Sequence, residues 1–312
     1  MRKSVLQTLV ELAGKDDRIL LLTADLGYTI LEPFAAQFPS RFYNVGVAEQ
    51  NMLGLAAGLA ESGFIPFCYS MATFASMRPF EFTRNGALYH QYPVRILGVG
   101  GGFEYGSAGW THYGLEDLGI MRTLPEMTVI APADFQQARQ AVLATWNLPG
   151  PVYYRLGKND HRIVPNLAGR FRLTEIESVR EGKAGLLLTT GSLAVEALEA
   201  ADRLAAQGIE VSVGVVACLN PPPIQALIPW LAQFPLVFTV EAHFLNGGLG
   251  SLVAEIIAEN RIPCRLKRLG VAFIPRGVTG SEAFMNAYCG LSGDKLASTL
   301  LSAWEHRESD HG

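Results

Sequence analysis

The sequence predicts an α/β protein of two domains, each with a mostly parallel sheet flanked by helices. Two observations predict this class. Short apolar runs alternate with helical stretches along the chain. At roughly 150 residues per domain, the 312 residues also correspond to about two domains. We expect a first domain over residues 1–160, a linker over residues 161–182 and a second domain over residues 183–312.

Six short runs rich in β-branched and aromatic residues are the strand candidates of the first domain. In chain order they are RILLLTA, FYNV, FIPFCYS, VRILGV, MTVI and VYYR. Because helical stretches separate them, we expect a parallel sheet covered on both faces. The pattern breaks in residues 161–181, where mixed charge, Pro165 and Gly169 are typical of a segment that crosses a surface.

The second domain repeats this alternation. Its strand candidates are GLLLTTG, IEVSVGVV, PLVFTVE and CRLKRLG. A helix is predicted over residues 192–208, with Ser192 as its N-cap and Gly208 at its end.

Composition excludes several classes of partner. With 17% charged residues, a net charge of -4 and a pI of about 5.9, the chain has no basic field for nucleic acid or an anionic membrane. The four cysteines form no C-x-x-C pair, which is typical of a reduced intracellular protein. No apolar run reaches the ~18 residues that span a bilayer, and the N-terminal segment lacks the apolar core of a signal peptide. We therefore expect a cytoplasmic protein.

The segment YNVGVAEQNMLGLAAGLAESG, residues 43–63, carries the most information about chemistry. A strand is predicted to end near Val45, Gly46 to make the turn, and a helix to begin with Glu49 in its first turns. Gly54 and Gly58 lie on one face of that helix, which predicts close approach of another backbone. A carboxylate at a helix N-terminus is stabilised by the macrodipole, so a purely structural role for Glu49 stays open.

Several motifs then follow in a fixed order. They are G-V-A-E-Q-N-M, G-F-I-P, a T-F pair, T-H-x-x-x-E-D-L-x-x-M-R-x-L-P-x-M-T-V-I-x-P-A-D at residues 111–134, and VEAHFLNGGLGSLVAE at residues 240–255. This order resembles transketolases and 1-deoxyxylulose-5-phosphate synthases over nearly the whole chain. The resemblance implies a thiamine-diphosphate pyrimidine-binding domain followed by a transketolase C-terminal domain.

The resemblance implies a role for each matching residue. Glu49 would hydrogen-bond the ring nitrogen of the cofactor's aminopyrimidine, because a carboxylic acid in a water-poor pocket can share its proton with the ring. This favours the tautomer that takes the proton from the thiazolium. Phe74 would pack on the pyrimidine and Leu26 would also contact the cofactor, although aromatic residues at helical spacing are usually core. His112 would move protons or bind the donor's hydroxyls.

Three cations are similar to substrate-binding residues of the family. Arg78 is similar to a substrate-contacting arginine of the deoxyxylulose synthases. Arg155 and Lys158 fall where the family places cations for a sugar phosphate, which needs such donors once water is excluded. Surface salt bridges or solvated charges are the alternative. One extra residue between Pro66 and Arg78 leaves the register of Phe74 and Arg78 open.

The chain departs from the family in two ways. Ala108 and Gly100 stand where transketolases carry an aspartate and a histidine near the donor, so the donor sugar is not predicted. The chain also lacks the G-D-G that holds the diphosphate through Mg²⁺. We therefore expect no metal ligand here and a separate N-terminal transketolase subunit that carries G-D-G, in an α2β2 assembly.

The sequence thus favours ketol transfer, in which a two-carbon unit moves from a ketose, most simply a phosphorylated one, to an aldehyde. A β subunit of a 2-oxo-acid dehydrogenase and a non-catalytic partner subunit are the alternatives. The T-H-x-x-x-E-D-L segment favours the transketolase. Glu241, His243 and the GGLG turn are interpreted as structural.

Overall fold

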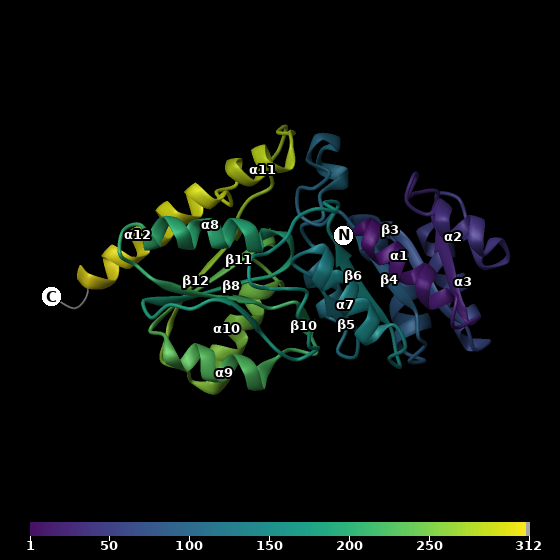
Figure 1. Cartoon of the computed structure of the whole chain (residues 1–312), viewed down its shortest axis with the longest axis horizontal. Coiled ribbons are helices and arrows are strands. Elements are labelled where there is room, and N and C mark those ends of the chain that lie inside the picture. Colours follow the sequence, from purple (N-terminus) through teal and green to yellow (C-terminus); the bar gives the residue numbers. More distant parts are fainter. Residues whose placement is uncertain (310–312) are drawn as a thin grey trace.

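The computed structural model describes residues 1–309 as an elongated molecule in which two sheets stand side by side (Figure 1). The predicted class is confirmed, because helices cover both faces of each mostly parallel sheet. Among residues 1–309, no helix combines the length and the apolar character that a bilayer span requires.

The first sheet has seven strands in the order β10-β5-β6-β4-β3-β1-β2. All neighbours are parallel except β10 and β5. The strands β1 to β6 coincide with the six predicted runs. The bounds are β1 Ile19–Thr23, β2 Phe42–Asn44, β3 Ile65–Met71, β4 Arg95–Val99, β5 Thr128–Ile130, β6 Val152–Leu156 and β10 Cys218–Asn220.

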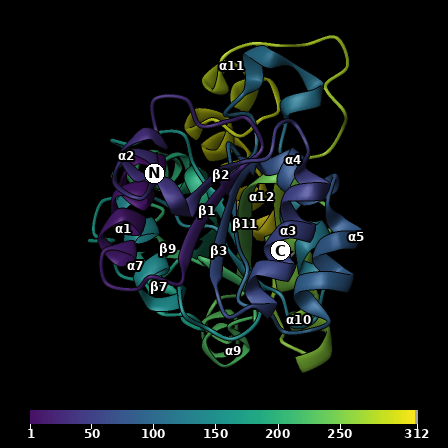
Figure 2. The same ribbon diagram turned by 90° about the vertical axis from the view of Figure 1, so that its right-hand side faces the viewer.

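Two layers of helices cover this sheet (Figure 2). On one face, α1 (Arg2–Ala13) and α7 (Phe135–Thr145) bury Leu9 and Ala138. On the other face, α3 (Glu49–Glu61), α4 (Ala72–Met77), α5 (Phe80–Phe82) and α6 (Asp117–Arg122) share a core with the second domain. Shorter elements are α2 Glu32–Gln37, the π-helical turn η2 Thr83–Leu88 and the 3₁₀ turns η1 Pro39–Arg41, η3 Gly106–Ala108 and η4 Trp110–His112.

The second sheet has five strands in the order β12-β11-β8-β9-β7, and only β7 is antiparallel to its neighbour. The four predicted runs are β8 Gly185–Thr189, β9 Val211–Val215, β11 Leu236–Phe244 and β12 Arg265–Val271. The fifth strand, β7 (Glu177–Arg180), lies within residues 161–182. The segment for which the sequence predicts a linker therefore also supplies an edge strand, and the domain limits stay a prediction.

Helices again lie on both sides of the second sheet. In Figure 1, α8 (Ala194–Ala205), α11 (Glu282–Tyr288) and α12 (Gly293–Ser309) are above it, whereas α9 (Ile224–Gln233) and α10 (Leu249–Asn260) are below it. The prediction that Ser192 caps α8 is wrong. Ser192 lies in the 3₁₀ turn η5 (Gly191–Leu193), and the N-cap residue is Leu193, which makes no side-chain cap.

Three glycines of the segment 43–63 test the predicted turn and the predicted packing of the helix that follows it. Gly46 makes the predicted turn, with φ of +73°. A Cβ on Gly54 would lie 3.3 Å from the Phe82 ring, but one on Gly58 would meet nothing within 4 Å. The neighbour of Gly54 is a side chain, so the close approach of a backbone expected on this face is found at neither glycine.

The two domains share a strand. β10 follows β9 of the second sheet, yet it pairs with β5 at the edge of the first sheet. The Asn220 side-chain amide donates hydrogen bonds to the carbonyls of Leu124, Pro125 and Met127 at 3.1, 3.0 and 2.6 Å. These bonds satisfy carbonyls in the turn before β5, so the second domain completes the first sheet.

Candidate active site

The predicted site residues gather at the carboxyl edge of the first sheet. Leu26 follows β1, Glu49 follows β2, Phe74 follows β3, the loop with His112 follows β4, and Lys158 follows β6. Because these strands are mutually parallel, their carboxyl ends meet at one edge, where α/β sheets commonly bind ligands.

Glu49 is the first residue of α3, and only 2% of its surface is exposed. The Ser70 hydroxyl donates to its Oε1 at 2.9 Å, and Arg78 donates to its Oε2 at 2.7 Å. Ser70 comes from the end of β3 and Arg78 follows α4. Both carboxylate oxygens are therefore hydrogen-bonded, which a buried carboxylate requires.

A series of contacts through Arg78 and Phe74 connects Glu49 to His112. The Arg78 guanidinium lies 4.0 Å from the centroid of the Phe74 ring, over its face. The Phe74 and His112 rings meet edge to face at 5.3 Å, and His112 Nδ1 lies 2.9 Å from the Thr111 hydroxyl. Glu49, Arg78, Phe74 and His112 therefore form one continuous row.

This row fits the pyrimidine part of thiamine diphosphate. The Arg78 guanidinium is a flat group with N–H donors, and it both stacks on Phe74 and donates to Glu49. An aminopyrimidine ring would make the same two kinds of contact. The Arg78 side chain is 44% exposed, so it can move toward solvent and leave that place to the ring.

Leu26 lies at the same edge of the sheet and is half-buried. The Thr23 hydroxyl donates to the Leu26 carbonyl at 2.8 Å and lies 3.3 Å from its amide nitrogen. This turn fixes the path of the chain after β1. A cofactor contact for Leu26 stays a prediction.

Lys158 lies on the His112 side of the row. Its ammonium group donates to the Glu104 carbonyl at 3.0 Å and lies 4.1 Å from the centroid of the Tyr105 ring. The Tyr105 and His112 rings are 6.4 Å apart. Lys158 thus remains a candidate for binding an anionic group of a substrate near His112.

The hypothesis that Arg155 binds a phosphate does not fit the structure. Arg155 is 5% exposed, and its Nε lies 3.1 Å from the Asp117 carboxylate. Its terminal NH2 group donates to the carbonyls of Gly114 and Ala242, the latter at 2.7 Å. Tyr153 donates to the same Asp117 oxygen at 2.7 Å. The guanidinium is thus bound to groups inside the protein.

Sequence reasoning missed Ser70, Glu104, Tyr105 and Asp117 as neighbours of the predicted residues. Ser70 had a signal, because it is a polar residue at the carboxyl end of an apolar run. Asp117 is the aspartate of the T-H-x-x-x-E-D-L motif, but nothing local indicates that its partner is Arg155.

Glu104, which contacts Lys158, is a buried carboxyl group whose pKa is shifted. Burial, and secondly the negative charge of Glu282, raise the pKa of the Glu104 carboxyl from 4.5 to about 7. The Lys158 amide donates to its Oε2 at 2.6 Å. A raised pKa means that the neutral form is favoured in the folded state. The stability that the folded protein has while the Glu104 carboxyl is neutral is fully present below pH 4.5. It is lost as the pH rises through about 7, because the buried carboxyl then ionises.

Glu104→Gln is therefore expected to flatten the pH dependence of stability. Glutamine keeps an acceptor for the Lys158 amide but cannot ionise. Between about pH 5 and pH 8 the wild type should lose on the order of 2 kcal/mol of unfolding free energy that the variant retains. Urea unfolding at both pH values measures this, with the exposed Glu175→Gln as control. An unchanged pH dependence in Glu104→Gln would refute the expectation.

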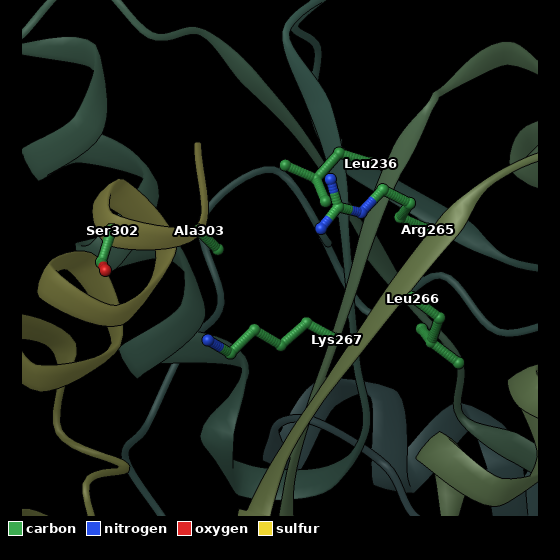
Figure 3. Close-up of a pocket in the computed structure, with 6 residues that line it drawn as sticks. All are labelled: Leu236, Arg265, Leu266, Lys267, Ser302 and Ala303. Carbon is green, nitrogen blue, oxygen red and sulfur yellow. The ribbon is translucent and has the colours of Figure 1, made fainter. Parts of the chain in front are cut away.

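A surface hollow with a volume of about 360 Å³ lies elsewhere. It opens between the edge strand β12 and helix α12, with Lys267 and Ser302 on opposite sides (Figure 3). It belongs to the second domain, away from Glu49. Within residues 1–309, no group of three or more His, Cys, Asp or Glu side chains is arranged to hold a metal ion.

Comparison with known proteins identifies the family of both domains. Residues 1–163 match the family described as transketolase, pyrimidine binding domain, and residues 174–296 match transketolase, C-terminal domain. The chain is similar to one of the subunits of apulose-4-phosphate transketolase of Actinobacillus succinogenes, with 35% identity over 87% of this chain and 88% of that protein. It is also similar to the 6-deoxy-6-sulfo-D-fructose transketolase subunit SqwH of a Clostridium species, with 39% identity over 87% of this chain and 84% of that protein.

A solved structure covers almost the same extent. A split gene transketolase, described as an inactive beta4 tetramer, superposes with a TM-score of 0.88 at 35% identity, over 97% of this chain and 98% of that chain. The family matches and the fold agree over nearly the whole chain. The chain therefore belongs to the transketolase family and is built from its pyrimidine-binding and C-terminal domains.

Proposed function

We propose that this chain is the pyrimidine-binding subunit of a split transketolase that moves a two-carbon ketol unit from a phosphorylated ketose to an aldehyde. The observation that carries the proposal is the buried Glu49 carboxylate beside Phe74 and His112 at the carboxyl edge of a parallel sheet. Thiamine diphosphate, when bound, supplies the electron sink that allows a carbon–carbon bond next to a carbonyl to break.

Each residue of the row has a proposed task. The Ser70 hydrogen bond to Oε1 fixes the orientation of the Glu49 carboxyl group, which would exchange a proton with the pyrimidine ring of a bound cofactor. Phe74 would pack on that ring once Arg78 had moved away. His112 moves protons on the substrate, and Lys158 binds the phosphate.

A second chain is proposed to hold the diphosphate and Mg²⁺. The sequence lacks the G-D-G of the family, and both named relatives are themselves subunits. Exposed apolar side chains lie on the helices α3, α4 and α5 and in the turn before α3, which we call the apolar layer. They are Val47, Leu55, Met77 and Phe82, which are 74, 40, 43 and 42% exposed. We propose that the G-D-G subunit covers this apolar layer, in an α2β2 assembly, since a patch of this kind is costly to leave in water.

The related beta4 tetramer is described as inactive, which supports a further part of the proposal. We expect this chain alone to be inactive, because it lacks the ligands for the cofactor's diphosphate. A non-catalytic subunit, the alternative, would bind its partner through the same surface, but its Glu49 would have no function in catalysis.

Reconstitution tests the proposal directly. The chain is purified alone and with a co-encoded subunit that contains G-D-G, and both samples receive Mg²⁺, thiamine diphosphate, a ketose phosphate and an aldehyde. Ketol transfer is expected only in the mixture. Decarboxylation of a 2-oxo acid by the mixture would instead favour the dehydrogenase alternative. Normal cofactor binding with neither reaction would favour the non-catalytic subunit.

A pair of surface variants tests the partner surface in the same experiment. Leu55→Glu places a charge in the apolar layer on α3, and co-elution of the two subunits should be lost. Phe284→Glu is the control, because Phe284 is 50% exposed but belongs to α11 of the second domain. If both variants assemble normally, the partner does not cover this surface.

A further inference from the structure

The two ends of the loop that carries His112 are joined by a short backbone bridge, which we call the neck. The loop connects β4 to α6 and contains only the short turns η3 and η4. Gly102 and Gly114 form a single antiparallel bridge, in which each amide donates to the other carbonyl at 2.7 and 3.0 Å. His112 thus lies in a closed loop whose two ends meet at this bridge.

The end of β11, in the second domain, packs against this neck. The Phe244 amide donates to the Leu115 carbonyl at 2.9 Å, and Arg155 connects the carbonyls of Gly114 and Ala242. A Cβ on Gly102 would come within 2.6 Å of the Ala242 Cβ, so only glycine allows this approach. Both segments of the chain that form the neck, at Gly102 and at Gly114, therefore contact the second domain or a residue that it holds.

His243 adds a contact that the local sequence of α6 lacks. The side chain is 1% exposed, and its Nε2 lies 3.1 Å from the amide nitrogen of Gly119. Gly119 is the third residue of α6, whose N-cap residue Glu116 makes no side-chain cap. That amide has no partner within the helix, so His243 caps α6 from the other domain.

The tautomer of His243 follows from its second contact. Its Nδ1 lies 2.7 Å from the Phe244 carbonyl, which can only accept. Nδ1 therefore carries the hydrogen, and Nε2 is free to accept the Gly119 hydrogen bond. Leucine at this position would have a similar bulk but no acceptor, whereas glutamine would keep one.

Contacts on the far side of His112 complete the arrangement. The Tyr113 hydroxyl donates to the Val278 carbonyl at 2.8 Å, and the Gly280 amide donates to the Gly106 carbonyl at 3.4 Å. The tip of the loop and α11 lie side by side in both views (Figures 1 and 2). Arg122, at the end of α6, donates to the Gly247 carbonyl at 3.0 Å. The second domain thus contacts the loop before and after His112.

We propose that residues 242–247 of the second domain clamp the loop that carries His112, and that His243 is a positioning residue for His112. The clamp gives the second domain a task in the reaction that the first domain performs. It rests on the proposed function only in assigning a catalytic role to His112. The contacts with Gly119, Leu115 and Gly114 stand independently of it.

His243→Leu tests the clamp in the assembled complex, with His243→Gln as the conservative variant. In His243→Leu, amide hydrogen exchange should rise about tenfold in peptides that cover residues 102–119 and stay unchanged in α8. kcat should fall by about 10- to 100-fold, because small misplacement of a catalytic group is costly. The KM for the donor and the affinity for thiamine diphosphate should change little, and glutamine should restore both exchange and kcat.

Two results would overturn the clamp. One is unchanged exchange at residues 102–119 in His243→Leu. The other is faster exchange that extends to α8, which would mean that His243 serves general stability. If the wild-type complex shows no ketol transfer, the proposed function fails, while the exchange measurement still decides whether the clamp exists.

Discussion

Glu49→Gln is expected to lower ketol transfer by the assembled enzyme by about 10²- to 10⁴-fold, the usual contribution of a positioned acid or base. Glutamine has nearly the same volume and can still accept the Ser70 hydrogen bond at the Oε1 position. It has no carboxyl proton to exchange with the pyrimidine ring. The loss should therefore appear in kcat, with the fold and the subunit assembly unchanged.

The rate of exchange of the cofactor's C2 proton in D₂O isolates this step, and NMR of quenched samples measures it. Exchange should become slow in Glu49→Gln. Glu61→Gln is the matched control, because Glu61 is an exposed residue at the other end of the same helix. Fast exchange in Glu49→Gln would show that Glu49 does not activate the cofactor.

Arg155→Met is expected to lower the free energy of unfolding by about 3–5 kcal/mol, the usual cost of removing one partner of a buried ion pair. Methionine fills much of the same volume but leaves the Asp117 carboxylate buried with Tyr153 as its remaining donor. The carbonyl of Ala242 also loses the Arg155 donor, and the carbonyl of Gly114 keeps only the hydrogen bond from the Gly102 amide. These groups lie inside the protein, where water cannot replace the donor that they lose.

Urea unfolding monitored by circular dichroism measures the effect. Arg203→Ala is the control, because Arg203 pairs with Glu199 on the surface of α8, and its removal should leave the unfolding midpoint unchanged. A stable Arg155→Met protein with a raised KM for a phosphorylated donor would instead restore the hypothesis that Arg155 binds substrate.

Most of the fold could be predicted from the sequence because most of its strands, although not β2 and β12, are apolar runs buried on both faces. All five residues of β1 and of β8 are buried, and each run stands out from its neighbours. The strands β7 and β10 lack that contrast, since they are short and contain polar residues. β10 pairs with a strand of the other domain, and local composition carries no information about such a partner.

The candidate site, like the fold, could be predicted only in part. Glu49, Phe74 and His112 belong to motifs of the family, and the structure brings them together at one edge of the sheet. For Arg155 the sequence could not decide between the two roles, because a cation at the end of a strand looks the same whether it faces a ligand or a buried carboxylate. Only the tertiary structure shows that Asp117 lies beside it.

The strand β10 also bears on how such a chain can be divided during evolution. A gene break between the two domains would give a first half whose sheet ends at β5 with an unpaired edge. The carbonyls of Leu124, Pro125 and Met127 would lose Asn220 in the same event. Such a half would be prone to aggregate or to exchange strands with its own copies. The two domains are therefore expected to be inherited and recombined as one unit.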